Sequence, residues 1–219
     1  MNQYQVIELE DFIGQKHFRL FSKYSDPTYS LTTVVDLTAF YHHAKKQGYP
    51  IYLSLVYLMT KALNEVTAFC YRYDGEKILL FDRIDPGFTV MTDFGVYDNC
   101  DDIDIHGDFR TFLNEAIPLV AEIKKGSYLG REQIDVRLDK FYFSSLPWME
   151  FTSLTQPIDN GPFAYIPRIA WDKFCFKDGK VTMHLNFQVH HALIEGVHLG
   201  QAITRIQKYL NEPELILIG

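Results

Sequence analysis

The sequence predicts an α/β protein of the two-layer α+β kind, in which a mixed β-sheet has helices packed on it. Strand-like segments interleave irregularly with segments of helical periodicity, which excludes a regular doubly wound sheet. Two Asp-Gly turns, at Asp74-Gly75 and Asp178-Gly179, mark hairpins and therefore antiparallel strand pairs. With 219 residues, 47% of them hydrophobic, the chain is long enough for one sizeable core, so we expect a single domain over residues 1–219.

In the first half of the chain, alternation and β-branched residues predict strands, and 3.6-residue periodicity predicts helices. Asp11 and Asp36 are expected N-caps, and Pro50 suits the first turn of a third helix. The expected strands are 4–9, 29–35, 69–73, 78–81 and 88–91, and the expected helices are 12–21, 37–48 and 50–66.

The second half contains two further helices and most of the remaining strands. A helical pattern runs from about Asp108 to Ile123, but Pro118 lies inside it and predicts a kink or a split into two pieces. The last helix is expected from Gly196 to Asn211. The expected strands are 140–145, 151–154, 164–171, 174–176 and 181–189.

Composition and charge exclude several classes of function. The formal net charge is -7 without a long basic run, so a nucleic-acid footprint is absent. The sequence lacks the glycine-rich motifs that bind phosphate groups, so it gives no support for a Rossmann or P-loop nucleotide site. Asp98, Asp101, Asp102 and Asp104 form an acidic run that we expect to be a solvated loop, with a metal site as the minor alternative.

The cysteines and the apolar segments indicate a cytoplasmic protein. Cys70, Cys100 and Cys175 are odd in number and lack CxxC spacing, as expected of reduced thiols. The N-terminus has no apolar signal segment, and the longest apolar stretch, 49–59, is too short to cross a membrane.

Two adjacent histidines, His190 and His191, are the first candidates for chemistry. They lie at the end of a strand-like run, and Glu195-Gly196 follows at the start of the last helix. A side chain at such a junction is held rigidly yet remains accessible, and an imidazole can accept and return a proton near neutral pH. Adjacent strand residues point to opposite faces, so we expect one histidine to be catalytic and the other structural. The alternative is a pair of ordinary core histidines; a metal site lacks a third ligand at suitable spacing.

Ser144 is the second candidate. It ends a strand-like run in the segment Ser144-Ser145-Leu146-Pro147-Trp148, where Pro147 forces an extended turn. A serine hydroxyl at a strand end can donate a hydrogen bond to a developing oxyanion. The alternative is a serine that merely caps the turn.

Taken together, these segments resemble the chloramphenicol acetyltransferase family. Further similar stretches are His17-Phe18, Tyr29-Ser30-Leu31-Thr32, Asp85-Pro86-Gly87-Phe88-Thr89-Val90 and Gln188-Val189, so the resemblance extends over nearly the whole chain. The HHxxxDG-type pattern alone is shared with acyltransferase cores of 2-oxo-acid dehydrogenase complexes and with peptide-synthetase condensation domains. The serine segment, the Asp-Pro-x-Phe-Thr-Val segment and the compact length favour the chloramphenicol acetyltransferase family over these other two groups.

The resemblance implies an acetyl-CoA-dependent O-acetyltransferase that needs no metal. His191 would be the general base on an acceptor hydroxyl, and Ser144 would stabilise the oxyanion. It also implies a homotrimer with active sites between subunits, and a role in antibiotic resistance.

This chain departs from the family at two positions that act together. Glu195 stands where the family has an Asp, and Gly14 stands where the family has the Arg that pairs with that Asp. Both halves of an ion pair have changed, so Glu195 must find another partner or reach solvent. We expect Glu195 and Gly14 to shape the site without taking part in proton transfer.

The expected acceptor pocket also differs from the family's. Phe21 stands where the family commonly has Tyr, and Ala170 stands where the family has Thr. Asp98 falls approximately where the family has an aromatic wall of the pocket. Phe21, Ala170 and Tyr29 are the expected substrate-binding residues. Three hypotheses follow: acetylation of chloramphenicol or a related amphenicol, the same chemistry on a different hydroxyl acceptor, or a catalytically weakened homologue with a binding role.

Overall fold

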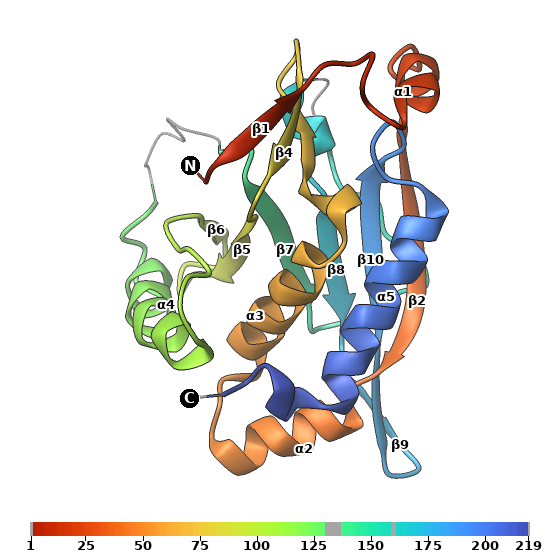
Figure 1. Ribbon diagram of the computed structural model, residues 1–219. Helices are drawn as coiled ribbons and strands as arrows, with labels where there is room; N and C mark the ends of the chain where they lie inside the picture. The colour runs from red at the N-terminus through yellow and green to blue at the C-terminus, as the bar shows by residue number, and fades with distance from the viewer. Residues whose placement is uncertain (1, 130–136, 159–160, 219) are drawn as a thin grey trace.

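The computed structural model describes residues 2–129, 137–158 and 161–218 (Figure 1). Within these ranges the strands are β1 (Tyr4–Ile7), β2 (Thr28–Asp36), β3 (Tyr71–Tyr73), β4 (Ile78–Phe81), β5 (Asp85–Met91), β6 (Tyr97–Cys100), β7 (Lys140–Leu146), β8 (Arg168–Asp172), β9 (Cys175–Lys177) and β10 (Lys180–His190). The helices are α1 (Gln15–Phe21), α2 (Thr38–Gln47), α3 (Ile51–Asn64), α4 (Phe109–Lys124) and α5 (Gly196–Asn211), with short 3-10 turns at Thr67–Cys70, Pro162–Tyr165 and Pro213–Leu215.

The main sheet is mixed, as the sequence predicts. Its strand order is β2-β10-β8-β7-β5-β6, and β9 extends the sheet by pairing with β10. β7 runs parallel to both β5 and β8, whereas the other neighbouring strands are antiparallel. A second sheet, β1-β4-β3, contains the hairpin predicted at Asp74-Gly75.

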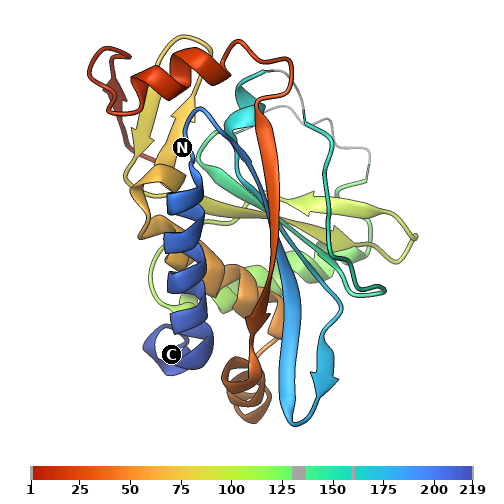
Figure 2. The same ribbon diagram turned by 90° about the vertical axis from the view of Figure 1, so that its right-hand side faces the viewer.

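Helices α3 and α5 cover one face of the main sheet (Figure 2). α3 is buried on most sides because its sequence is apolar nearly all round. Tyr52 of α3 packs its ring against Phe88 and Trp171, with ring centroids 5.8 and 5.4 Å away, so these strand residues face the helices. The hydrophobic core lies in this layer.

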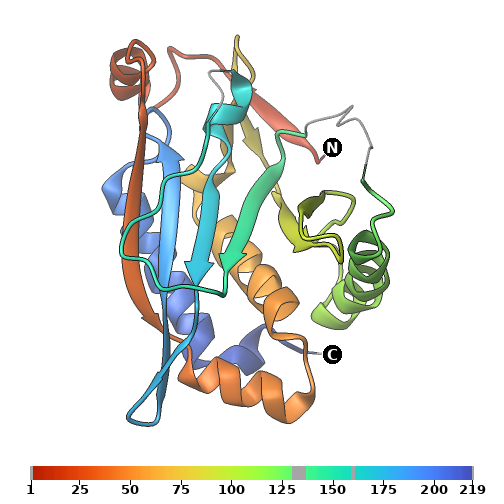
Figure 3. The same ribbon diagram turned by 180° about the vertical axis from the view of Figure 1, so that it is seen from behind.

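The opposite face of the sheet carries polar side chains. Thr32, Asn186, Ala170 and Ser144 lie side by side on β2, β10, β8 and β7, and the neighbouring Thr89 continues this row on β5. The segment 147–158 crosses this face instead of a helix (Figure 3). Asn186 holds the segment by donating from Nδ2 to the Leu154 carbonyl at 3.2 Å.

The strand predicted at 151–154 is wrong. These residues lie in the crossing segment, and side chains of the sheet hold their backbone in place of a strand ladder: Asp172 accepts a hydrogen bond from the Phe151 amide at 3.2 Å. The strand predicted from 164 begins only at Arg168, because Pro162–Tyr165 forms a 3-10 turn.

The helices α1, α2 and α4 test the predicted N-caps and the predicted effect of Pro118. α1 begins at Gln15 with Gly14 as its N-cap, so Asp11 does not cap it; the Asp11 amide lies instead in a turn, donating to Glu8. Asp36 does act at the start of α2, where its carboxylate accepts from the Thr38 amide at 2.9 Å. α4 is one continuous helix through Pro118, N-capped by Asp108.

The acidic run is a solvated loop only in part: residues 101–107 form a loop, and Asp102 is exposed. Asp98 belongs to β6, and Asp104 pairs with Arg137 at 3.1 Å. Burial raises the pKa of Asp101, partly offset by Lys140. In the described ranges, no group of three His, Cys, Asp or Glu side chains is placed to hold a metal ion, and no helix is long and apolar enough to span a bilayer.

Candidate active site

His190 and His191 lie where β10 ends, six and five residues before α5 begins. His190 is the last strand residue and is buried, with its ring stacked on Tyr165 at 3.9 Å. Its Nδ1 accepts a hydrogen bond from the Ala192 amide at 3.2 Å. Burial, and secondarily the nearby His191, lowers the pKa of His190 to about 4. His190 is therefore neutral at physiological pH and supports the turn.

His191 is half-buried and occupies a different environment. Its ring stacks on Phe21 at 4.0 Å with an interplanar angle of 9°, and the Tyr29 ring lies 4.6 Å away. Its amide donates to the Pro27 carbonyl at 2.9 Å. Its Nδ1 is buried and has no hydrogen-bond partner among the described residues. Ring packing, more than hydrogen bonding, therefore orients this imidazole.

Glu195 connects the loop after His191 to two helices. It is the N-cap of α5, where its carboxylate accepts from the His198 amide and His198 Nδ1 accepts from the Glu195 amide at 3.0 Å. Its Oε1 also lies 2.5 Å from His17 Nδ1 on α1. Burial lowers the pKa of His198, which fits a neutral ring accepting at Nδ1. Glu195 has thus found a new partner in His17.

Gly14 is packed too tightly to carry a side chain. A Cβ at this position would lie 2.7 Å from the ring of Phe12, which is itself buried. An Arg here would require Phe12 to move. The loss of the arginine and the packing of Phe12 are therefore linked.

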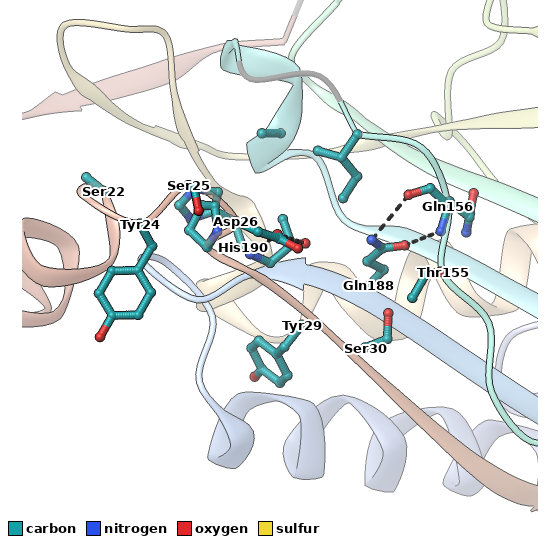
Figure 4. Close-up of a pocket in the computed structure, with 14 residues that line it drawn as sticks. Ser22, Tyr24, Ser25, Asp26, Tyr29, Ser30, Thr155, Gln156, Gln188 and His190 are labelled. Atoms are coloured by element: carbon teal, nitrogen blue, oxygen red, sulfur yellow. Dashed lines mark hydrogen bonds between the residues drawn. The ribbon is translucent and has the colours of Figure 1, made fainter.

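A cavity of about 780 Å³ opens beside this junction (Figure 4). Tyr29, Ser30, Gln188 and His190 line it from the sheet, and Gln156 lines it from the crossing segment. The backbone N–H of Gln156 donates a hydrogen bond to Gln188 Oε1 at 2.6 Å. Ser30 Oγ and Gln156 Nε2 are buried without a partner among the described residues, so this face retains hydrogen-bonding capacity.

Ser144 lies on β7, at a second place on the same polar face. Its Oγ is 3.3 Å from Thr89 Oγ1. It lines two adjoining cavities of about 350 and 410 Å³, and both also contain Thr89, Tyr97 and Gln156. A hydroxyl so placed can donate to an oxygen of a molecule bound in either cavity.

The prediction that Asp98 forms a wall of this pocket is wrong. Asp98 pairs with the buried Val90 and shares its side of the sheet, whereas Asn99 pairs with Thr89 on the Ser144 side. Because side chains alternate along a strand, Asn99 and Tyr97 take the place expected for Asp98. Asn99 and Tyr142 line the larger of these two cavities.

One chain does not bring His191 and Ser144 together. Ser144 pairs with Ala170, Ala170 pairs with Asn186, and His191 follows Asn186 by five residues. Two strand spacings and five residue rises place the two Cα atoms about 19 Å apart. This distance exceeds the combined reach of the two side chains to a common reacting atom.

The three expected substrate-binding residues fall into two groups. Phe21 and Tyr29 both contact His191, and Tyr29 also donates its hydroxyl to the Ile194 carbonyl at 3.3 Å. Ala170 is fully buried beside Ser144 in the strand register.

Sequence reasoning missed Thr89, Asn99 and His17 as parts of the site. The alternation of β5 and β6 could have placed Thr89 and Asn99 on the Ser144 face once the pairing was known. Nothing local marked His17, since its contact with Glu195 spans 178 residues of sequence.

The mixed sheet with helices packed on one face is a fold that this chain shares with solved structures. A solved chloramphenicol acetyltransferase has this fold with a TM-score of 0.82 at 24% identity, covering 95% of this chain and all of that one. The cubic core of a pyruvate dehydrogenase multienzyme complex has it with a TM-score of 0.66 at 21% identity, covering 94% of this chain and 90% of that one.

Comparisons of sequence identify the family more specifically than these comparisons of fold. A family model described as chloramphenicol acetyltransferase matches residues 1–207. The chain is 26% identical over 208 residues to a chloramphenicol acetyltransferase of Proteus mirabilis, covering 94% of each. It is 28% identical over 211 residues to one of Staphylococcus aureus, covering 93% of this chain and 95% of the relative. The chain belongs to the chloramphenicol acetyltransferase family and is an acyltransferase.

Proposed function

We propose that this protein is an acetyl-CoA-dependent O-acetyltransferase acting on chloramphenicol or a related amphenicol. The family match and the placement of His191 and Ser144 support this function. In this proposal the chain is a single catalytic domain over residues 1–219, works as a homotrimer in the cytoplasm, and confers antibiotic resistance by modifying the drug.

His191 is the general base in the proposed reaction. Its imidazole takes the proton of the acceptor hydroxyl as the oxygen attacks the thioester carbonyl. The resulting oxyanion accepts a hydrogen bond from Ser144 Oγ, a contribution of about 3 kcal/mol at comparable sites. The C–S bond then breaks, the thiolate of coenzyme A recovers the proton from His191, and the acetyl ester leaves. The step uses no metal.

The observation that carries the proposal is the presence of two separate half-sites on one chain. His191 and Ser144 lie about 19 Å apart within a copy, by strand geometry. A second copy docked on the polar face would bring its Ser144 to the His191 of the first, as expected for a cyclic trimer. Ser30 Oγ and Asn186 Oδ1 on this face are buried and find no hydrogen-bond partner within the part of the chain that the structure describes, which is compatible with such docking.

The experiment is a thiol-release assay with acetyl-CoA and chloramphenicol, run on wild type and His191→Ala. The proposal expects turnover in wild type and a loss of about 1,000-fold or more in the variant, as for removal of a catalytic base. Turnover that survives in His191→Ala would exclude His191 as the base. A folded wild type without turnover would exclude chloramphenicol as the acceptor.

A second candidate is the same chemistry on a different hydroxyl compound. Polar side chains such as Asn99 and Arg168 line the cavity beside Ser144 together with aromatic rings such as Phe163, so an acceptor with further hydrogen-bonding groups also suits it. A panel of polyhydroxylated and aromatic alcohols, assayed for thiol release, separates the two candidates. A kcat/KM for chloramphenicol above that of every other alcohol would reject the second.

A further inference from the structure

Helix α1 contacts the segment between β10 and α5 at two points. Phe21 covers one face of the His191 ring at 4.0 Å, and His17 meets Glu195 at 2.5 Å. His17 and Phe21 are four residues apart, so they project from the same side of the helix, and their ring centroids are 6.4 Å apart. One helical face thus contacts both ends of the segment 191–195.

Three further contacts confine this segment on its other sides. The His191 amide donates to Pro27, the Tyr29 hydroxyl donates to Ile194, and the Glu195 carboxylate caps α5 through His198. None of them bonds the imidazole of His191, whose Nδ1 has no partner among the described residues. The angle of this ring therefore depends on the two rings packed against it, Tyr29 on β2 and Phe21 on α1, and hence in part on where α1 is held.

The contact between His17 and Glu195 contributes little to global stability. The two side chains are 46% and 37% exposed, and ion pairs so exposed are weak because water screens them. The contact between His17 and Glu195 therefore acts locally, on the elements that it joins. The contact joins α1 to the N-terminus of α5 across the catalytic segment.

We infer that His17 is a positioning residue for the reaction, which fixes α1, and through Phe21 the imidazole of His191, by binding Glu195. This inference rests on the proposed role of His191 as the base. It explains how the chain tolerates Gly14 at the position of the family's arginine. His17 lies three residues further along α1 on the same helical side, and Glu195 is one methylene longer than Asp, so the link has moved along the helix.

The experiment compares His17→Gln with Lys16→Gln, which removes a charge from an exposed neighbour on the same helix. We expect His17→Gln to lower kcat about 10- to 100-fold, because small misplacements of a catalytic group cost this much. The KM values and the melting temperature should stay near those of wild type. Lys16→Gln should resemble wild type, and His17→Arg, which can donate a hydrogen bond to the Glu195 carboxylate, should recover most of the lost kcat.

A second measurement does not require turnover. Iodoacetamide alkylation of His191, followed by peptide mass spectrometry, reports the mobility and access of its ring in each variant. We expect severalfold faster alkylation of His191 in His17→Gln than in Lys16→Gln. If His17→Gln alters the melting temperature alone, leaving kcat and the alkylation rate of His191 unchanged, the inference is overturned. If wild type shows no acetyl transfer but the alkylation difference appears, the proposed acceptor fails and the positioning role stands.

Discussion

His190 and His191 are identical in type and adjacent in sequence, yet their surroundings give them different properties. His190 lies under Tyr165 with its pKa lowered to about 4 by burial and by His191. His191 follows the end of the strand, where it contacts Phe21 and Tyr29. The sequence could predict that the two would differ, because alternation sends neighbours to opposite faces. The strand end alone did not determine which one would be buried.

The buried His190 should make the fold acid-sensitive. Its pKa falls from 6.5 in the unfolded chain to about 4, so only the unfolded state takes up this proton between those values. The free energy of unfolding should therefore be unaffected by this group above pH 6.5 and fall as pH drops towards about 4, by up to about 3 kcal/mol.

The variant His190→Phe tests this origin. It keeps a ring against Tyr165 and removes the titrating group, at a cost of about 1 kcal/mol for the lost hydrogen bond to the Ala192 amide. Urea denaturation between pH 7 and pH 4.5 should show a smaller loss of stability in His190→Phe than in wild type. Parallel losses in the two proteins would assign the acid sensitivity to other groups.

Ser144 has a matched control in the next residue. Ser144→Ala should lower kcat about 100-fold, since in the proposed mechanism it removes one donor to the oxyanion. Ser145 also borders the smaller cavity, but it pairs with Trp171 and strand alternation turns its side chain away from Ser144, so Ser145→Ala should lower kcat far less. Steady-state kinetics with both variants check this. Equal effects would indicate that the strand, and not the hydroxyl of Ser144, matters.

At the level of elements, local patterns predicted the helices and strands well, and tertiary contacts explain the failures. Residues 151–154 look like a strand because Phe151 and Thr152 favour extended structure, but Asn186 and Asp172 hold this region across the sheet face. Pro118 predicts either a bend or a split in α4, and the split is wrong, because the helix continues past this residue. Propensity describes each segment alone, and packing decides between its alternatives.

The start of β7 depends on a buried ionic cluster. Arg137 donates to Asp139 at 2.8 Å and to Asp85 at 3.3 Å, and both carboxylates are fully buried. Burial opposes ionisation of Asp139, but hydrogen bonds from Arg137 and the Asn2 amide leave its pKa below 3.8. Its contribution to stability is complete above pH 3.8 and is lost as pH falls through the lower folded pKa.

Arg137→Met should therefore destabilise the fold by about 3 kcal/mol, because it leaves buried carboxylates short of a partner. Denaturant titration at pH 7 measures this change. Arg19→Met is the control, since Arg19 makes an exposed pair with Glu10 and its loss should cost less than about 1 kcal/mol. A cost for Arg137→Met no greater than that of the control would contradict the role given to the cluster.

At the scale of the whole molecule, the fold class and the order of elements could be predicted, whereas the sheet order could not. Neighbours such as β2 and β10 meet across about 150 residues of sequence, and no local pattern specifies that pairing. The site was predicted as His191 and Ser144 from residue chemistry and family resemblance. Their separation within one chain could be seen only from the register of β7, β8 and β10. The contact of His17 with Glu195 also required the three-dimensional structure.

The central claim is that His191 of one copy acts with Ser144 of another. Co-assembly of His191→Ala chains with Ser144→Ala chains tests it directly, because a mixed trimer contains one site with both natural residues. Random mixing of equal amounts should restore about a quarter of the wild-type activity, although each variant alone is nearly inactive. Mixed trimers with no more activity than the separate variants would contradict the claim and would place both residues of each site in one copy.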